Sequence, residues 1–128
     1  MKATAAFAVA ACIASATPSK AQPAARLPRS AEAMRAAAIA ERNQLGLLEY
    51  CETAGHITAE AVIRQRKFLA ALLPNADHAL GATEETSGRN GLIAFEESRI
   101  SLAADAAAQG ITVSYSCFQL ATRVLGAP

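Results

Sequence analysis

The chain has 128 residues, a formal net charge of +1 at pH 7, two tyrosines and no tryptophan. This length allows one domain. Nucleic-acid binding needs a basic surface or aromatic stacking platforms, and this composition supplies neither, so it argues against nucleic acid as a partner.

The first 21 residues predict a signal peptide. Lys2 carries a positive charge, and an uncharged, alanine-rich run follows from residue 3 to residue 19. Ser19 and Ala21 then place small residues at the −3 and −1 positions of a cleavage site after Ala21. Cleavage after Ala16 is the competing choice. The run is too short and too weakly apolar for a membrane span.

The segment Val9–Cys12 also fits a lipoprotein cleavage box, in which Cys12 would be acylated and become the first residue. This is the minor alternative, because the preceding apolar stretch is short. Both routes predict a periplasmic or secreted protein. Removal of residues 1–21 takes away two lysines, leaving ten Lys and Arg against eleven Asp and Glu, a net charge of −1.

Two cysteines, Cys51 and Cys117, remain after either route. Two cysteines can pair in only one way, and an oxidising compartment favours the pairing. We therefore predict a disulfide between them, with two buried unpaired thiols as the alternative. Closing a loop of about 67 residues would stabilise the fold by roughly 4 kcal/mol in the chain-entropy model.

Residues 22–29 contain two prolines and predict a flexible lead-in, and residues 30–126 predict a helical domain. Ser30 is a favourable N-cap, and a helix-favouring run continues from it to Thr53. Gly55 is placed to end this first helix in the left-handed conformation.

A second helix is predicted from the N-cap Thr58 to Leu73, where Pro74 stops it. Ile57 and Val62 have the spacing of a hydrophobic staple. The apolar side chains of this helix predict its buried side: Val62, Phe68, Leu69, Leu72 and Leu73.

Residues 75–91 are rich in turn and cap residues and predict the least regular part of the domain, with at most a short helical turn near residues 76–80 or 84–86. Helix is then predicted from Leu92 to Ala108, ended by Gly110. Thr112 caps a last helix that Gly126 closes. Residues 111–116 alternate as in a strand, but helix is predicted there because no partner strand is predicted elsewhere in the chain.

The predicted fold class is therefore all-α, a small antiparallel bundle of about four helices with one disulfide. Two helical hairpins would pack together, and the disulfide would fix the last helix against the first.

Catalytic and metal-binding patterns are absent from the sequence. Neither His56 nor His78 has a second His, Cys or Asp at ligand spacing, so both are predicted to be corner or surface residues. Adjacent carboxylates on a helix point about 100° apart, so the pairs at 84–85 and 96–97 do not form a dyad. We predict no enzymatic activity and no cofactor.

Two surface charge patterns remain. Glu96 precedes Arg99 by one helical turn, which predicts an ordinary ion pair. Arg64, Arg66 and Lys67 form a candidate interaction patch for an anionic lipid headgroup or an acidic partner. The alternative for this patch is the solvated face of an amphipathic bundle helix.

Two stretches resemble a family of small exported helical proteins of Gram-negative bacteria. The first is Leu45–Ile57, followed by Ala61-Val62 and Leu72–Pro74, and the second is Ala108–Val113, followed by Cys117 and Gln119–Ala121. The resemblance implies a signal peptide, one cysteine near the first stretch and one in the last helix. It implies no catalytic residues. Some members carry a label as pore-forming relatives of small early-secreted mycobacterial antigens, whose Trp-x-Gly turn is absent here. The single disulfide is also similar to that of periplasmic acid-stress chaperones.

These patterns predict a non-enzymatic binding or assembly module of the bacterial envelope, with a second copy or another envelope protein as its partner. A pore-forming or membrane-active protein and an acid-stress periplasmic chaperone are the two alternatives. The role of residues 75–91 stays open.

Overall fold

The computed structural model describes residues 30–72 and 79–126. The predicted signal peptide, the lead-in and residues 73–78, with Leu73, Pro74 and His78, lie outside the described residues. The elements in chain order are α1 (Ala31–Thr53), α2 (Ala59–Leu72), α3 (Ala82–Arg89), β1 (Leu92–Phe95), β2 (Ser98–Ser101), α4 (Leu102–Gln109) and α5 (Val113–Leu125).

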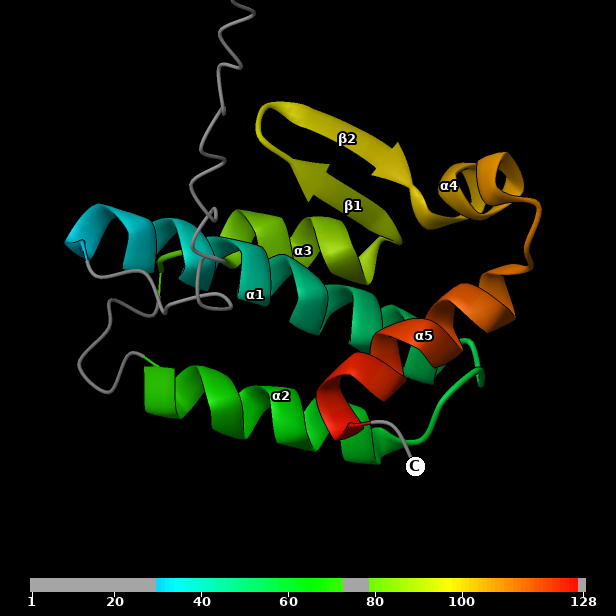
Figure 1. The fold of residues 1–128 in the computed structure, drawn as a ribbon, viewed down its shortest axis with the longest axis horizontal. Coiled ribbons are helices and arrows are strands. Elements are labelled where there is room, and N and C mark those ends of the chain that lie inside the picture. Colours follow the sequence, from blue (N-terminus) through cyan, green and yellow to red (C-terminus); the bar gives the residue numbers. More distant parts are fainter. Residues whose placement is uncertain (1–29, 73–78, 127–128) are drawn as a thin grey trace, which may run out of the picture.

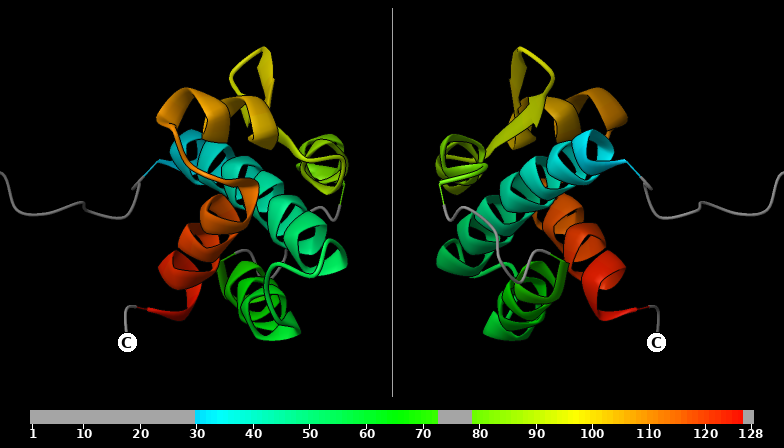
Figure 2. Two further views of the ribbon diagram at one scale, coloured as in Figure 1. Left: turned by 90° about the vertical axis from the view of Figure 1, so that its right-hand side faces the viewer. Right: turned by 90° about the vertical axis from the view of Figure 1, so that its left-hand side faces the viewer.

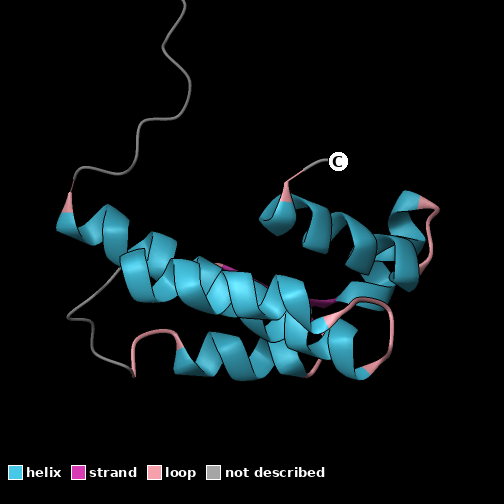
Figure 3. Ribbon diagram, turned by 90° about the horizontal axis from the view of Figure 1, so that it is seen from below, coloured by secondary structure: helices cyan, strands magenta, loops and turns pink. Residues whose placement is uncertain are grey.

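Helix α1 is the central element of the fold (Figure 1). It contacts α2, α3, α5 and β1. Figures 2 and 3 show α3 and α5 on opposite sides of α1. The hairpin of β1 and β2 lies above α1 in Figure 1 and α2 lies below it, and Figure 2 shows the same order. The hairpin and α2 are therefore on opposite sides of the molecule.

The ends of α1 follow the predicted local signals. The Ser30 hydroxyl oxygen accepts a hydrogen bond from the Ala33 backbone N–H at 3.1 Å. At the other end the helix closes after Thr53, and Gly55 adopts a left-handed φ of +75°. These contacts satisfy polar groups that the helix leaves free at its ends. The predicted helix from residue 30 to residue 53 is confirmed.

Helices α1 and α3 cross in direct backbone contact. A Cβ atom at Gly46 would lie 2.0 Å from the backbone oxygen of Glu85, and one at Gly88 would lie 2.4 Å from the backbone oxygen of Asn43. Helix α3 occupies half of the segment 75–91 that was predicted to be irregular. Glycine and serine disfavour helix in isolation, so packing against α1 supplies the stability that local propensity lacks.

Residues 92–101 form a β-hairpin, and the predicted helix from residue 92 is wrong up to Ser101. Ile93 pairs with Ile100 and Phe95 with Ser98 in an antiparallel register. The described residues thus hold five helices and a two-stranded sheet, rather than about four helices alone. The predicted end at Gly110 is confirmed, because this residue takes a left-handed φ of +69° after α4.

One buried side chain explains why this segment is extended. The Asn43 amide nitrogen donates to the backbone oxygens of Glu84 at 2.9 Å and Leu92 at 3.0 Å, and its side-chain oxygen accepts from the backbone N–H of Ala94 at 3.1 Å. Asn43 therefore bonds the outer edge of β1 much as a neighbouring strand would. The short hairpin gains this support only from a contact that is distant in sequence.

Replacing Asn43 with alanine is expected to lower the free energy of unfolding by about 2 kcal/mol, because it leaves partly buried backbone groups of Leu92 and Ala94 without partners. Urea unfolding followed by circular dichroism measures this change. Asn90→Ala is the matched control, since Asn90 is exposed and is expected to change stability by only about 0.5 kcal/mol. Equal effects of the two substitutions would contradict the role of Asn43.

The core has two neighbouring parts. Buried side chains of α1, α2 and α5 form the first: Leu45, Leu48, Ala61, Val62 and Ala121. Ile57 packs against this cluster, which contains its predicted staple partner Val62. The second part joins α1, α4 and α5: Cys51, Leu102 and Cys117.

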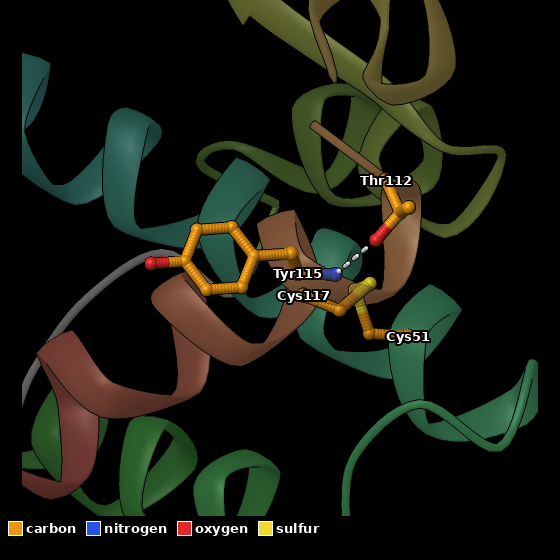
Figure 4. Close-up of a disulfide and its surroundings, with 4 residues drawn as sticks. All are labelled: Cys51, Thr112, Tyr115 and Cys117. Carbon is orange, nitrogen blue, oxygen red and sulfur yellow. Dashed lines mark hydrogen bonds between the residues drawn. A yellow bond between two sulfur atoms is a disulfide. The ribbon is translucent and has the colours of Figure 1, made fainter. Parts of the chain in front are cut away.

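The structure contains the predicted disulfide, in the second part of the core (Figure 4). The Cα atoms of Cys51 and Cys117 are 5.6 Å apart, and both side chains are fully buried. The Thr112 hydroxyl oxygen accepts from the Tyr115 backbone N–H at 3.1 Å and starts α5. This cap confirms helix rather than strand after residue 112, and it places Cys117 in the second turn, against the end of α1. The last helix is thus fixed to the first, as predicted.

Candidate functional site

One group of charged side chains forms ion pairs between helices. Glu49 on α1 contacts Arg66 of α2 at 2.6 Å and Arg89 of α3. Glu85 of α3 contacts Arg42 of α1 at 2.9 Å and also Arg89. These five side chains link α1, α2 and α3, so we assign them a structural role.

The carboxyl group of Glu49 has a perturbed pKa. Burial acts to raise the pKa, but hydrogen bonds from Arg89 and Arg66 outweigh burial, so the pKa lies below its ordinary value. The hydrogen bond to Glu49 likewise raises the pKa of Arg89. The charged form of Glu49 is thus favoured in the folded state.

A lowered pKa in the folded state makes stability depend on pH. The contribution of Glu49 is present above the unfolded-state pKa and is lost as pH falls through the folded-state pKa. We expect the free energy of unfolding to fall on acidification below about pH 4.3, the ordinary glutamate pKa. Urea titrations across this range measure the fall, and Glu49→Gln is expected to make it shallower. An unchanged pH profile in Glu49→Gln would contradict this role.

The structure does not bring the predicted patch of Arg64, Arg66 and Lys67 together as one surface. Residues two apart on a helix point about 200° apart. Arg66 accordingly turns towards Glu49, whereas Arg64 and Lys67 lie on the outward side of α2 beside Phe68. Phe68, predicted as buried, has 46% of its surface exposed.

Arg64 lines a groove between α2 and α5, which lie side by side in Figure 3. The groove has a volume of about 290 Å³ and is lined by side chains of three helices: Glu41, Gln44, Arg64, Gln65, Phe68, Arg123 and Val124. We call it the α2–α5 groove. Phe68 and Val124 are its apolar residues, and Arg64 and Arg123 are its cationic ones.

A hydrogen-bond network orders part of the groove lining. The buried Gln65 amide nitrogen donates to Glu41, at 3.2 Å to the backbone oxygen and at 2.6 Å to the carboxylate. The Gln44 amide nitrogen donates to the side-chain oxygen of Gln65 at 3.3 Å. These bonds join α1 to α2, so this part of the groove is fixed before any partner arrives.

The two arginines give the groove a charge excess. None of the ion pairs within residues 30–72 and 79–126 involves Arg64 or Arg123. The groove lining includes two arginines and one carboxylate, that of Glu41, which is hydrogen-bonded to Gln65. Guanidinium groups suit carboxylates and phosphates, and an exposed aromatic ring beside them adds apolar contact. The groove can therefore bind an anionic group that has an apolar neighbour.

The other sequence candidates are placed elsewhere. His56 is exposed at the corner between α1 and α2, and His78 lies outside the described residues. The predicted Glu96–Arg99 ion pair is wrong, because the hairpin turn replaces the expected helical turn. Arg99 instead contacts the Glu84 carboxylate at 3.7 Å and donates to the backbone oxygen of Glu96 at 3.3 Å. The described part of the chain holds no cluster of three metal-ligating side chains.

No protein-family model matches the chain, and no similar curated protein or solved structure was found. Among the helices described here, none is both long and apolar enough to cross a lipid bilayer.

Proposed function

We propose that the protein is a non-enzymatic binding and assembly module of the bacterial envelope, and that the α2–α5 groove is its binding surface. The observation that carries this proposal is that Arg64 and Arg123, from two helices, line one groove together with the exposed Phe68. Arginine and aromatic side chains are the residues that most often dominate binding energy at protein interfaces.

The ion pairs of Glu49 and Glu85 support a binding role rather than a catalytic one. Glu49 and Glu85 are the carboxylates with the lowest exposure among the ion pairs, and each contacts two arginines that join helices. Carboxylates held in this way are engaged within the fold, whereas a general acid or base must exchange a proton with a substrate. The envelope location is supported by the buried disulfide, since such bonds persist in oxidising compartments.

A charge reversal in the groove tests this proposal. We expect the wild-type protein to associate with itself, or to crosslink to one defined envelope protein, in a manner that Arg64→Glu/Arg123→Glu abolishes. Sedimentation velocity over a range of concentrations measures self-association, and crosslinking in intact cells measures the partner.

Arg35→Glu is the control for reversing a positive charge outside the groove, because Arg35 is exposed on α1 and is not part of the groove lining. Circular dichroism checks that each variant is folded. A wild-type protein that stays monomeric and gives no specific crosslink would contradict the proposed function, as would a groove variant that behaves like the wild type in both assays.

A further inference from the structure

The hairpin carries a second charged and aromatic surface, formed by Phe95, Glu96 and Glu97, which we call the hairpin tip. Phe95 is the most exposed large apolar side chain of the described residues, with 69% of its surface accessible. Glu96 and Glu97 are exposed, and neither carboxylate takes part in an ion pair within residues 30–72 and 79–126. The tip thus combines two unpaired negative charges with an aromatic ring.

We propose that the hairpin tip of one copy of this protein binds in the α2–α5 groove of a second copy. This inference rests on the proposed function, because it names the occupant of the same groove.

The chemistry of the two surfaces is complementary. The tip offers the carboxylates of Glu96 and Glu97, and the groove offers the guanidinium groups of Arg64 and Arg123. Charge-assisted hydrogen bonds between such groups are stronger and more directional than neutral ones. Phe95 would lie against the exposed ring of Phe68, and aromatic pairs add to the apolar area that is buried.

The backbone of the tip gives an independent reason to assign it a function. Glu96 has a left-handed φ of +52°, and it stands first in the two-residue loop between β1 and β2. Glycine, asparagine and aspartate are the residues that favour this position in a tight hairpin. Glu96 therefore occupies a backbone position at which another residue type would be more stable. Residues held in such conformations are frequent at functional sites.

The placement of the two surfaces requires a second molecule. The hairpin and α2 lie on opposite sides of α1 in both Figure 1 and Figure 2. The tip therefore cannot reach the groove of its own chain. Each contact is also head-to-tail, since it uses the tip of one copy and the groove of another. Every dimer then keeps one free tip and one free groove, so association continues into a chain or closes into a ring.

Neutral variants of the full chain test each half of the contact. The groove variant is Arg64→Gln/Arg123→Gln, and the tip variant is Glu96→Gln/Glu97→Gln. In sedimentation equilibrium we expect the wild-type mass to rise with concentration, and each variant to raise the dissociation constant about tenfold or more. Glu32→Gln/Glu52→Gln removes the same charge as the tip variant at sites away from the tip, and it is expected to associate like the wild type.

Mixing the two variants tests the head-to-tail geometry. The groove variant keeps a native tip and the tip variant keeps a native groove, so an equimolar mixture is expected to form a one-to-one dimer that grows no further. A chain that carries both Arg64→Glu/Arg123→Glu and Glu96→Lys/Glu97→Lys exchanges the charges, and it is expected to regain self-association.

Other outcomes separate this inference from the proposed function. If the groove variant loses an envelope partner while the tip variant keeps it, the tip assignment is overturned and the proposed function stands. Binding to phosphatidylglycerol vesicles that needs Arg64 and Arg123 but not Glu96 and Glu97 would overturn it in favour of a lipid headgroup. A wild-type protein that is monomeric at all concentrations would also overturn it, and if no envelope partner crosslinks, both proposals fail.

Discussion

Replacing Gly46 with alanine is expected to lower the free energy of unfolding by about 3 kcal/mol or more, because overpacking at a rigid backbone contact cannot relax by a rotamer change. The added Cβ would lie 2.0 Å from the backbone oxygen of Glu85 and 2.8 Å from the backbone nitrogen of Arg89. Helices α1 and α3 would have to separate. Since α3 also contacts β1, we expect the hairpin to lose its support as well. Urea unfolding followed by circular dichroism measures the loss.

Gly110→Ala provides the matched comparison. Gly110 has a left-handed φ of +69°, but no neighbouring atom lies within 4 Å of the added Cβ. Its substitution adds only the backbone strain of an L-residue in this conformation, about 1 kcal/mol. If the two alanine variants are equally stable, the close crossing of α1 and α3 is not present in solution.

Loss of the disulfide is expected to have an effect of similar size. The bond closes a loop between residues 66 apart in sequence, which corresponds to about 4 kcal/mol in the chain-entropy model. A small domain has a total stability of about 5–15 kcal/mol, so this loss removes a large share. In a Cys12→Ser background, we expect Cys51→Ala/Cys117→Ala to show a much lower midpoint of thermal unfolding than the parent.

A reducing agent supplies the control for that variant. It is expected to lower the unfolding midpoint of the parent protein towards that of Cys51→Ala/Cys117→Ala, and to leave the variant unchanged. A parent protein whose midpoint does not respond to complete reduction would show that the bond contributes little to stability.

Elements with strong local signals could be predicted from the sequence. Ser30 and Thr112 each accept a hydrogen bond from the backbone N–H three residues on, and Gly55 and Gly110 each take the left-handed conformation near a helix end. These signals act within one helical turn, so they do not depend on the rest of the fold. The cysteine pair could be predicted for a different reason, since two cysteines allow one connectivity.

The hairpin could not be predicted in this way. The apolar residues Leu92, Phe95 and Ile100 fit a helical spacing, yet Ile93, Phe95 and Ile100 equally share one face of a hairpin. Asn43 resolves the ambiguity through bonds to β1, and a contact between residues so far apart leaves no mark on the local pattern.

The candidate site depends on packing in the same manner. The sequence indicated Arg64 as one of three neighbouring charges, but its partner in the groove is Arg123 on α5. Both residues line the groove because α5 packs against α1 and α2, and the disulfide at Cys117 helps to fix α5 in this place. The sequence also indicated the charge of Arg66. Its ion pair with Glu49 could not be predicted, because this contact depends on how α1 packs against α2.

The bonds from Asn43 also occupy part of an exposed strand edge. An exposed strand edge is a template on which other chains can add, and this is a common route to aggregation and amyloid. Asn43 occupies the Leu92 C=O and the Ala94 N–H on the edge of β1 that faces away from β2, so these two groups are not free to pair with another strand. Strand addition at this edge of the hairpin would first have to displace the Asn43 side chain.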